Sequence, residues 1–302
     1  MVEMGFFSAV RVSLLFLFMI GLLFIVSYFL GLSFYWFLIL SGIFTLSSWW
    51  FSDKLVLKMT GARLVTEEEA PELHSIVARL TEKAGLKKKP RVAIMDSATP
   101  NAFATGRSPG HSVVAVTTGL MRILNTEELE AVLAHEVGHV KHWDILIGAI
   151  AAMFAGAIAW LARWGIFFGR GSQRNMALVI LAWVLAPIAA MLIHLAISRG
   201  REYVEDEFSG RITGRPENLA NALRKLQQGV SRRPETTLNP ATSHMFIVHP
   251  FRGGALSGLF STHPSTENRI KRLMEQAKKM GRLPGSWEPR EITPDEYTIR
   301  LG

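Results

Sequence analysis

Apolar residues along this 302-residue chain gather into long blocks instead of alternating with polar residues. The first two blocks, residues 12–30 and 34–51, are each long enough to cross the hydrocarbon core of a bilayer as a helix. Trp36, Trp49 and Trp50 stand near the ends of the second block, where aromatic rings favour the membrane interface. We therefore predict two transmembrane helices joined by a tight hairpin.

Two further apolar blocks, residues 145–168 and 176–198, are separated by a short polar stretch and predict a second helical hairpin. Arg163 lies near the end of the third block, where its long side chain can extend to the interface. Pro187 and His194 make the fourth block less uniform. These two helices therefore either cross the bilayer or pack largely against protein.

With four crossings, the N-terminus, the region between the second and third spans, and the C-terminal third share one side of the membrane. More basic residues flank the spans on that side than on the other, and positive charge marks the cytoplasmic side. Those on the domain side are Arg11, Lys54, Lys58, Arg63, Lys141, Arg199 and Arg201, against Arg163, Arg170 and Arg174 opposite. We therefore expect the polar domain to face the cytoplasm.

The polar regions carry local signals for helices and strands. Thr66 and Glu69 form a capping-box pattern, and Asn125 with Glu128 forms a second one. The patterns predict a helix over 66–85, strands over 91–95 and 112–117, a helix from 125 through 139 towards the third span, and helices over 216–228 and 265–280. Residues 231–260 show no regular pattern, and we interpret this stretch as a mobile lid, a membrane-touching loop or a tether.

The amino-acid composition bears on what the protein can bind, whether a lipid bilayer, nucleic acid or a metal ion. Apolar residues make up 49% of the chain and charged residues only 19%, a balance that fits contact with a lipid bilayer. The formal net charge of +8 raises nucleic acid as a partner, but no stretch interleaves basic residues with stacking aromatics, so nucleic acid is not expected. The chain has no cysteine, and a transition metal would therefore be held by imidazole and carboxylate groups.

His135, Glu136 and His139 form a His-Glu-x-x-His motif within the predicted helix. Four residues advance a helix slightly more than one turn, so both imidazoles face the same way and can share one metal ion. Glu136 then flanks the ion as a base. His142 stands where a metzincin would have glycine, which excludes that class, and we expect this histidine at the membrane interface.

The third ligand is expected from an acidic cluster just after the fourth block. Glu202, Glu205 and Asp206 follow one another within five residues. Glu202 and Asp206 lie one helical turn apart on a shared face. One of the two can therefore bind the metal while the other orients a metal-binding histidine.

These features resemble the HtpX family of integral-membrane zinc metalloproteases, relatives of the CAAX prenyl endopeptidases. The resemblance covers nearly the whole chain. It is carried by the paired N-terminal spans and by residues 101–106 (NAFATG), 135–139 (HEVGH), 201–203 (REY), 261–264 (STHP) and 269–270 (RI). The resemblance implies an integral protein of a prokaryotic plasma membrane that degrades misfolded or damaged membrane proteins.

The resemblance also implies roles for single residues. It makes Glu202 the third zinc ligand and Asp206 a support for the site. Glu205 occupies a position where the family has a small alanine, so this carboxylate either competes for zinc or points to water. His263 is placed near the site, where its imidazole could stabilise an oxyanion.

Two more residues receive expected roles in binding or support. Arg269 is expected to anchor the region that follows His263. A substrate peptide could add to an exposed strand edge, either at 112–117 or at the adjacent segment that begins with Asn101. Membrane-protein loops, tails or peptides are the expected substrates.

The predicted protein is an α+β, mainly helical integral-membrane protein with about four transmembrane helices and a zincin-like metalloprotease domain carrying a small β-sheet. We divide it into membrane helices over 1–52 and 145–198 and a catalytic domain over 53–144 and 199–302. One Zn²⁺ per chain would activate a water molecule, with Glu136 as general base. A non-catalytic zinc-binding membrane scaffold or adaptor is the alternative function. An intramembrane protease is disfavoured because polar residues precede the motif.

Overall fold

The computed structural model describes residues 33–150, 199–232, 247 and 264–282, with a few positions between 10 and 24. The predicted span over 12–30 and those over 145–168 and 176–198 lie largely outside the described residues. His263 and most of the stretch 231–260 also lie outside the described residues. The described part is rich in helices and carries one small mixed sheet, as the sequence predicts.

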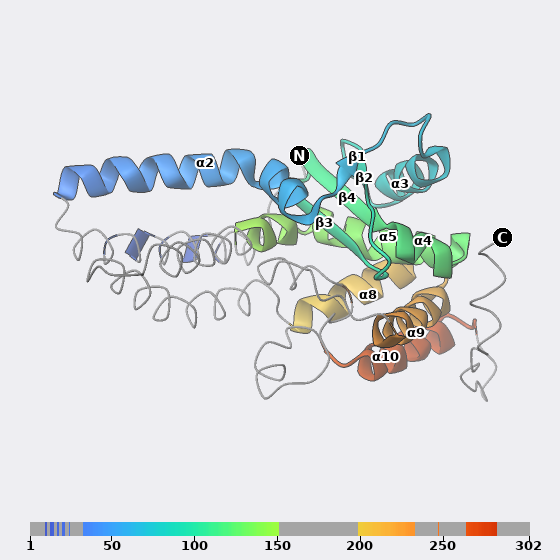
Figure 1. Cartoon of the computed structure of the whole chain (residues 1–302). Coiled ribbons are helices and arrows are strands. Elements are labelled where there is room, and N and C mark those ends of the chain that lie inside the picture. Colours follow the sequence, from blue (N-terminus) through green and yellow to red (C-terminus); the bar gives the residue numbers. More distant parts are fainter. Residues whose placement is uncertain are drawn as a thin grey trace.

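Helix α2 (Phe34–Thr60) projects from the rest of the described chain (Figure 1). It continues nine residues beyond the predicted end at residue 51, because Val56 near its C-terminal end packs into the protein core. Gly61, with a φ of 71°, ends it in the left-handed conformation that favours glycine. Among the described helices, none is both long and apolar enough to cross a membrane.

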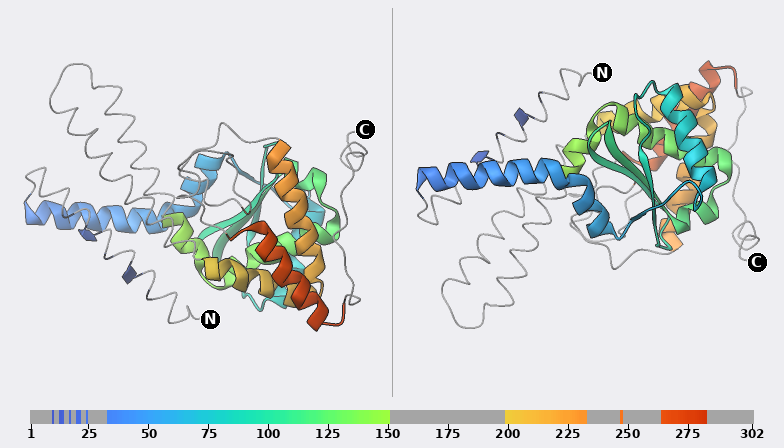
Figure 2. Two further views of the ribbon diagram at one scale, coloured as in Figure 1. Left: turned by 90° about the horizontal axis from the view of Figure 1, so that it is seen from below. Right: turned by 90° about the horizontal axis from the view of Figure 1, so that it is seen from above.

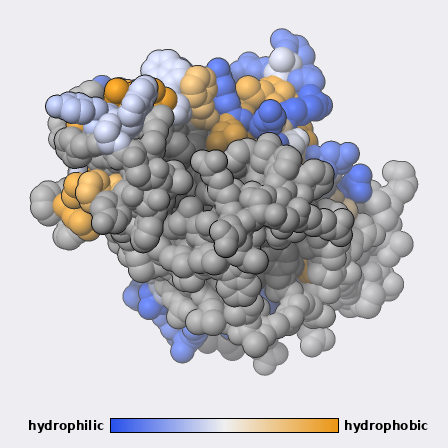
Figure 3. Space-filling model, turned by 60° about the vertical axis from the view of Figure 1, so that its left-hand side comes forward, coloured by the Kyte–Doolittle hydropathy of each residue, from blue (hydrophilic) through white to orange (hydrophobic). Residues whose placement is uncertain are grey.

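Many large apolar side chains of α2 are nevertheless exposed. They include Tyr35, Trp36, Ile43, Leu46 and Trp50. On the face of the molecule shown in Figure 3, apolar residues are exposed at the surface next to strongly hydrophilic residues. The C-terminal part of α2 contacts the rest of the described chain, where the guanidinium of Arg107 lies 4.3 Å from the ring centroid of Trp50.

The sheet contains four strands in the order β1-β2-β4-β3. They are β1 (Arg63–Leu64), β2 (Arg91–Met95), β3 (Ala102–Ser108) and β4 (His111–Thr117). Strands β2 and β4 pair in parallel, and the other two pairs are antiparallel. Because β4 is paired on both sides, it has no open edge for a substrate. This corrects the expectation for 112–117 and leaves β3 as the long edge strand.

Helix α3 (Pro71–Lys83) begins five residues later than the capping-box pattern predicts. Thr66 and Glu69 do exchange hydrogen bonds, with Thr66 N donating to Glu69 Oε2 at 2.8 Å, but they close a separate turn. Ala70 stands before a proline and is not helical, because the proline ring disfavours the helical conformation in the preceding residue. Pro71 then occupies the first turn, where it costs no hydrogen bond.

Short helix α4 (Thr118–Ile123) leads into α5 (Thr126–Lys141), whose capping box forms as predicted. Asn125 Oδ1 accepts from Glu128 N at 2.8 Å, and Glu128 Oε2 accepts from Asn125 N at 3.0 Å. The helix runs through His139 as predicted and ends at Lys141, where the continuous course expected towards the third span is interrupted. Trp143, with a φ of 67°, breaks it before helix resumes at residue 144.

Helices α8 (Arg199–Thr213), α9 (Pro216–Arg232) and α10 (Thr266–Lys279) lie on the side of α5 away from the sheet (Figures 1 and 2). The predicted helices over 216–228 and 265–280 correspond to α9 and α10. Helix α5 is thus the middle layer between the sheet and these helices, and its residues from 131 to 138 are all buried. A buried leucine core, Leu133, Leu219, Leu223, Leu226 and Leu273, fixes the layers against one another.

Candidate metal centre

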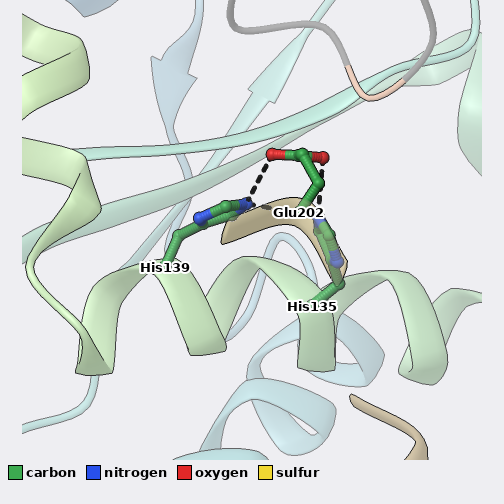
Figure 4. Close-up of side chains that lie close together, drawn as sticks. All are labelled: His135, His139 and Glu202. Carbon is green, nitrogen blue, oxygen red and sulfur yellow. Dashed lines mark hydrogen bonds and ion pairs between the residues drawn. The ribbon is translucent and has the colours of Figure 1, made fainter. Parts of the chain in front are cut away.

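Three buried or partly buried side chains from two helices converge on one point (Figure 4). His135 and His139 project from the same face of α5, and Glu202 comes from the first turn of α8. The two Nε2 atoms are 3.2 Å apart. Glu202 Oε2 lies 3.7 Å from Nε2 of His135, and Oε1 lies 3.5 Å from Nε2 of His139. The ligand atoms therefore point at one common position.

The spacing and chemistry of these atoms fit a zinc ion. Nitrogen and oxygen ligands at about 2.0–2.1 Å from a tetrahedral zinc stand about 3.3 Å from one another. The three separations, 3.2, 3.5 and 3.7 Å, lie close to this value. Two imidazoles and one carboxylate also leave the fourth tetrahedral position for water or substrate.

His135 is supported by a chain of buried groups that we call the buried arm: His135, Asp206 and Arg269. Asp206 Oδ1 lies 3.1 Å from Nδ1 of the imidazole, on the side away from Glu202. Arg269 donates two hydrogen bonds to this carboxylate, at 2.6 and 2.8 Å. Burial alone would raise the pKa of Asp206, but the guanidinium and the imidazole outweigh it and hold that pKa below its ordinary value.

His139 is supported by a second chain, the outer arm: His139, Asp144 and Arg201. Asp144 Oδ2 lies 3.2 Å from Nδ1 of the imidazole, and Arg201 Nη2 donates to the same oxygen at 2.8 Å. Burial opposes protonation of the imidazole, but the bond to Asp144 and the nearby carboxylates outweigh it and raise the pKa of His139 to about 10. Metal binding at neutral pH must therefore displace a proton from this side chain.

Sequence reasoning missed Asp144. This residue lies just beyond the break at Trp143, and a continuous helix would have carried it away from His139. The sequence did offer one indication that Asp144 supports the site: it is an acidic residue five positions after the second histidine. Arg201, just before the acidic cluster, was its possible partner.

Glu205 neither competes for the metal position nor points to water, which corrects both expectations. Its side chain is fully buried and accepts from Arg201 Nη2 at 2.5 Å, and it lies 2.8 Å from His142 Nδ1. Gly138 makes room for it, because a Cβ at that position would come within 2.3 Å of Glu205 Oε2. His142, expected at the membrane interface, thus contacts α8 through this carboxylate.

A second group of possible ligand atoms consists of His139, Asp144 and Glu205. The guanidinium of Arg201 lies between the two carboxylates and already supplies a positive charge there. We therefore assign no second metal to this group.

Glu136 lies next to the first ligand and is almost completely buried. Its carboxylate forms no hydrogen bond with another residue of the described ranges. Burial raises the pKa of Glu136, although the neighbouring imidazoles partly oppose this. Such a group can exchange protons near neutral pH more readily than an exposed glutamate.

Asn101 and Arg269, two other expected site residues, both hydrogen-bond to Ile247, a buried residue that sequence reasoning missed. Asn101, just before β3, accepts a hydrogen bond from Ile247 N, and Arg269 donates one to Ile247 O. Arg269 also lies 3.5 Å from Glu202 through Nη1. No sequence signal marks Ile247, because the surrounding stretch has no regular pattern.

Known proteins match this chain over most of its length. The profile of Peptidase family M48 matches residues 67–277, which include both motif histidines and the acidic cluster. A Protease HtpX homolog of Pyrococcus furiosus is 52% identical over 291 residues, covering 92% of this chain and 99% of the relative. One from Aquifex aeolicus is 49% identical over 257 residues, covering 81% and 84%.

A solved structure, the crystal structure of S. mikatae Ste24p, aligns with a TM-score of 0.48 and 18% identity, covering 84% of this chain and 62% of that chain. The family match and the identity to the HtpX homologs agree with the resemblance found in the sequence. The chain belongs to peptidase family M48 as an HtpX-type metalloprotease.

Proposed function

We propose that this metalloprotease is a zinc-dependent endopeptidase that hydrolyses peptide bonds of membrane proteins next to the bilayer surface. One observation carries the proposal: Glu202 meets His135 and His139 at a single position, with the buried carboxylate of Glu136 beside them. A purely structural zinc site needs ligands but no neighbouring base. The presence of Glu136 therefore favours catalysis over a non-catalytic scaffold.

The chemistry divides between the metal and the protein. A zinc ion held by His135, His139 and Glu202 would supply Lewis acidity, lowering the pKa of a water molecule and polarising the peptide carbonyl. Glu136 receives the proton that the water loses during attack. Because burial raises the pKa of this carboxyl group, the protonated group is a suitable acid to deliver that proton to the leaving amine.

Substrate binding is proposed at the edge of β3 that pairs with no other described strand. This strand pairs with β4 on one side, and it packs against α5, the helix that carries the motif. An extended peptide added along β3 would be recognised through main-chain hydrogen bonds. Such recognition accepts many sequences, which suits an enzyme acting on misfolded or damaged proteins.

Exposed apolar groups support a place at the membrane. The projecting helix α2 carries Tyr35, Trp36 and Leu46 in exposed positions. Arg107 lies against Trp50 near the junction with the catalytic unit, a pairing that suits the lipid headgroup region. The basic residues beside the predicted spans favour a catalytic unit on the cytoplasmic side of a prokaryotic plasma membrane.

The test is Glu136→Gln in the full chain, purified in detergent and assayed on a denatured membrane protein. We expect zinc content to be retained and cleavage to be lost, because the amide cannot accept the water proton. Glu130→Gln, on the same helix but paired with Arg79 at a partly exposed position, is the matched control and should keep cleavage. Cleavage by Glu136→Gln at the control's rate would overturn the mechanism, and a zinc-loaded parent that cleaves nothing would favour the scaffold.

A further inference from the structure

Ile247 is buried and held through its main chain on both sides. Its N–H donates to Asn101 Oδ1 at 3.0 Å, and its carbonyl accepts from Arg269 Nη1 at 3.1 Å. Only 4% of the residue is exposed. Two polar side chains far apart in the sequence therefore clamp one residue of the segment between α9 and α10.

The Asn101 side of the clamp is a rigid acceptor. A main-chain N–H requires an acceptor, so the amide must present its oxygen to Ile247. The main chain of Asn101 is itself held by Thr117, through a bond from Asn101 N to Thr117 Oγ1 and one from Thr117 N to Asn101 O, both 2.9 Å. The acceptor is thus fixed to the end of β4.

The Arg269 side of the clamp reaches the metal centre. The same Nη1 that donates to Ile247 lies 3.5 Å from Oε2 of Glu202. The other two guanidinium nitrogens donate to Asp206, which faces His135. Since the guanidinium is planar and rigid, fixing Nη1 also fixes the two nitrogens that hold Asp206.

We propose that Ile247 is a positioning residue of the metal centre: its main chain, docked between Asn101 and Arg269, fixes the guanidinium that holds Asp206 and borders Glu202. The inference rests on the proposed zinc site. Docking of Ile247 and binding of zinc then favour each other by the same factor, because coupling between two binding events is reciprocal.

Zinc affinity tests the proposal in one direction. The full chain in detergent carries Glu136→Gln to prevent self-cleavage, and affinity is measured by competition with a chelator. Ile247→Pro removes the donated N–H, whereas Ile247→Ala keeps it and removes only side-chain contacts. Loss of groups that directly contact metal ligands typically costs about 10–100-fold in affinity, and for this more distant residue we expect Ile247→Pro to bind about threefold to tenfold more weakly than Ile247→Ala.

Equal zinc affinities of the two Ile247 variants would overturn the proposal. Asn101→Ala tests it without adding a proline. Its matched control is Thr81→Val, a buried polar residue on α3 whose hydroxyl bonds only within its own helix. Asn101→Ala should bind zinc several-fold more weakly than Thr81→Val, and equal binding would contradict the clamp.

Limited proteolysis tests the reciprocal direction and does not depend on catalysis. A serine protease is used to cut between residues 232 and 264 of the Glu136→Gln chain, with and without zinc. We expect zinc to slow cutting several-fold in this chain and to have little effect once Ile247→Pro is added. Cutting that ignores zinc in a zinc-binding parent would refute the coupling alone, whereas a parent that binds no zinc would overturn the proposed function as well.

Discussion

The two imidazoles of the metal centre are held by the same chemistry in different surroundings. In the buried arm, the side chains of His135, Asp206 and Arg269 are at most 3% exposed. In the outer arm, those of His139, Asp144 and Arg201 are 10–21% exposed. In each arm an imidazole faces a carboxylate that an arginine holds from behind.

The two arms differ in which groups can replace a hydrogen-bond partner that a substitution removes. Water can approach the outer arm, and Glu205 and His142 add further charged or polar groups around Arg201. The buried arm instead continues inward to Ile247 and Asn101. We infer that the buried arm contributes more to stability and rigid geometry, and that the outer arm controls the proton exchanged for the metal.

The largest expected effect comes from removing the arginine of the buried arm. Arg269→Met would leave Asp206 as a buried carboxylate facing only an imidazole. Breaking a buried ion pair in this way costs about 3–5 kcal/mol of unfolding free energy. Arg201→Met should cost less, because solvent reaches Asp144 and His142 still contacts Glu205. Thermal unfolding in detergent measures both, and an equal or greater loss for Arg201→Met would erase the difference between the arms.

The next effect concerns zinc affinity. Asp206→Ala and Asp144→Ala each remove the carboxylate behind a metal-binding imidazole, a change that costs about 10–100-fold in affinity. We expect Asp206→Ala to fall near the upper end of this range and Asp144→Ala near the lower end, since water can replace Asp144. Chelator competition at fixed pH gives both values. A stronger loss for Asp144→Ala would reverse the ranking.

A third effect separates the arms by pH. The folded-state pKa of His139, about 10, lies above its ordinary value of 6.5. Protonation therefore stabilises the metal-free chain fully below pH 6.5, and this contribution is lost as the pH rises towards 10. The melting temperature of the metal-free chain should fall across that window. Asp144→Asn should flatten the fall, and an unchanged slope in this variant would show that His139 is not its source.

The parts of the fold and site that sequence could predict depend on local geometry. The spacing of His135 and His139 and the capping box at Asn125 act within about one helical turn, and the structure places these residues as that spacing requires. The start of α3 was mispredicted because Pro71 outweighs the Thr66 pattern, although the hydrogen bonds of that pattern do form.

What could not be predicted depends on tertiary contact. Asp144 reaches His139 only because the chain turns at Trp143, a non-glycine residue in the left-handed region. Glu205 is buried only because Gly138 on another helix leaves space for it. Ile247 is held by Asn101, just before β3, and by Arg269 of α10, and no local pattern marks it. For Glu205 and Ile247, two distant segments must meet before the residue acquires a partner, and for Asp144 the chain must turn within five residues of His139.

The central claim is that Glu202 completes the metal site and that the nearby Glu205 does not. Metal analysis of the purified full chain tests this directly, with Glu202→Ala and Glu205→Ala compared at equal protein concentration. We predict one zinc ion per chain for the parent and for Glu205→Ala, and loss of zinc from Glu202→Ala. Retention of zinc by Glu202→Ala together with its loss from Glu205→Ala would contradict the account.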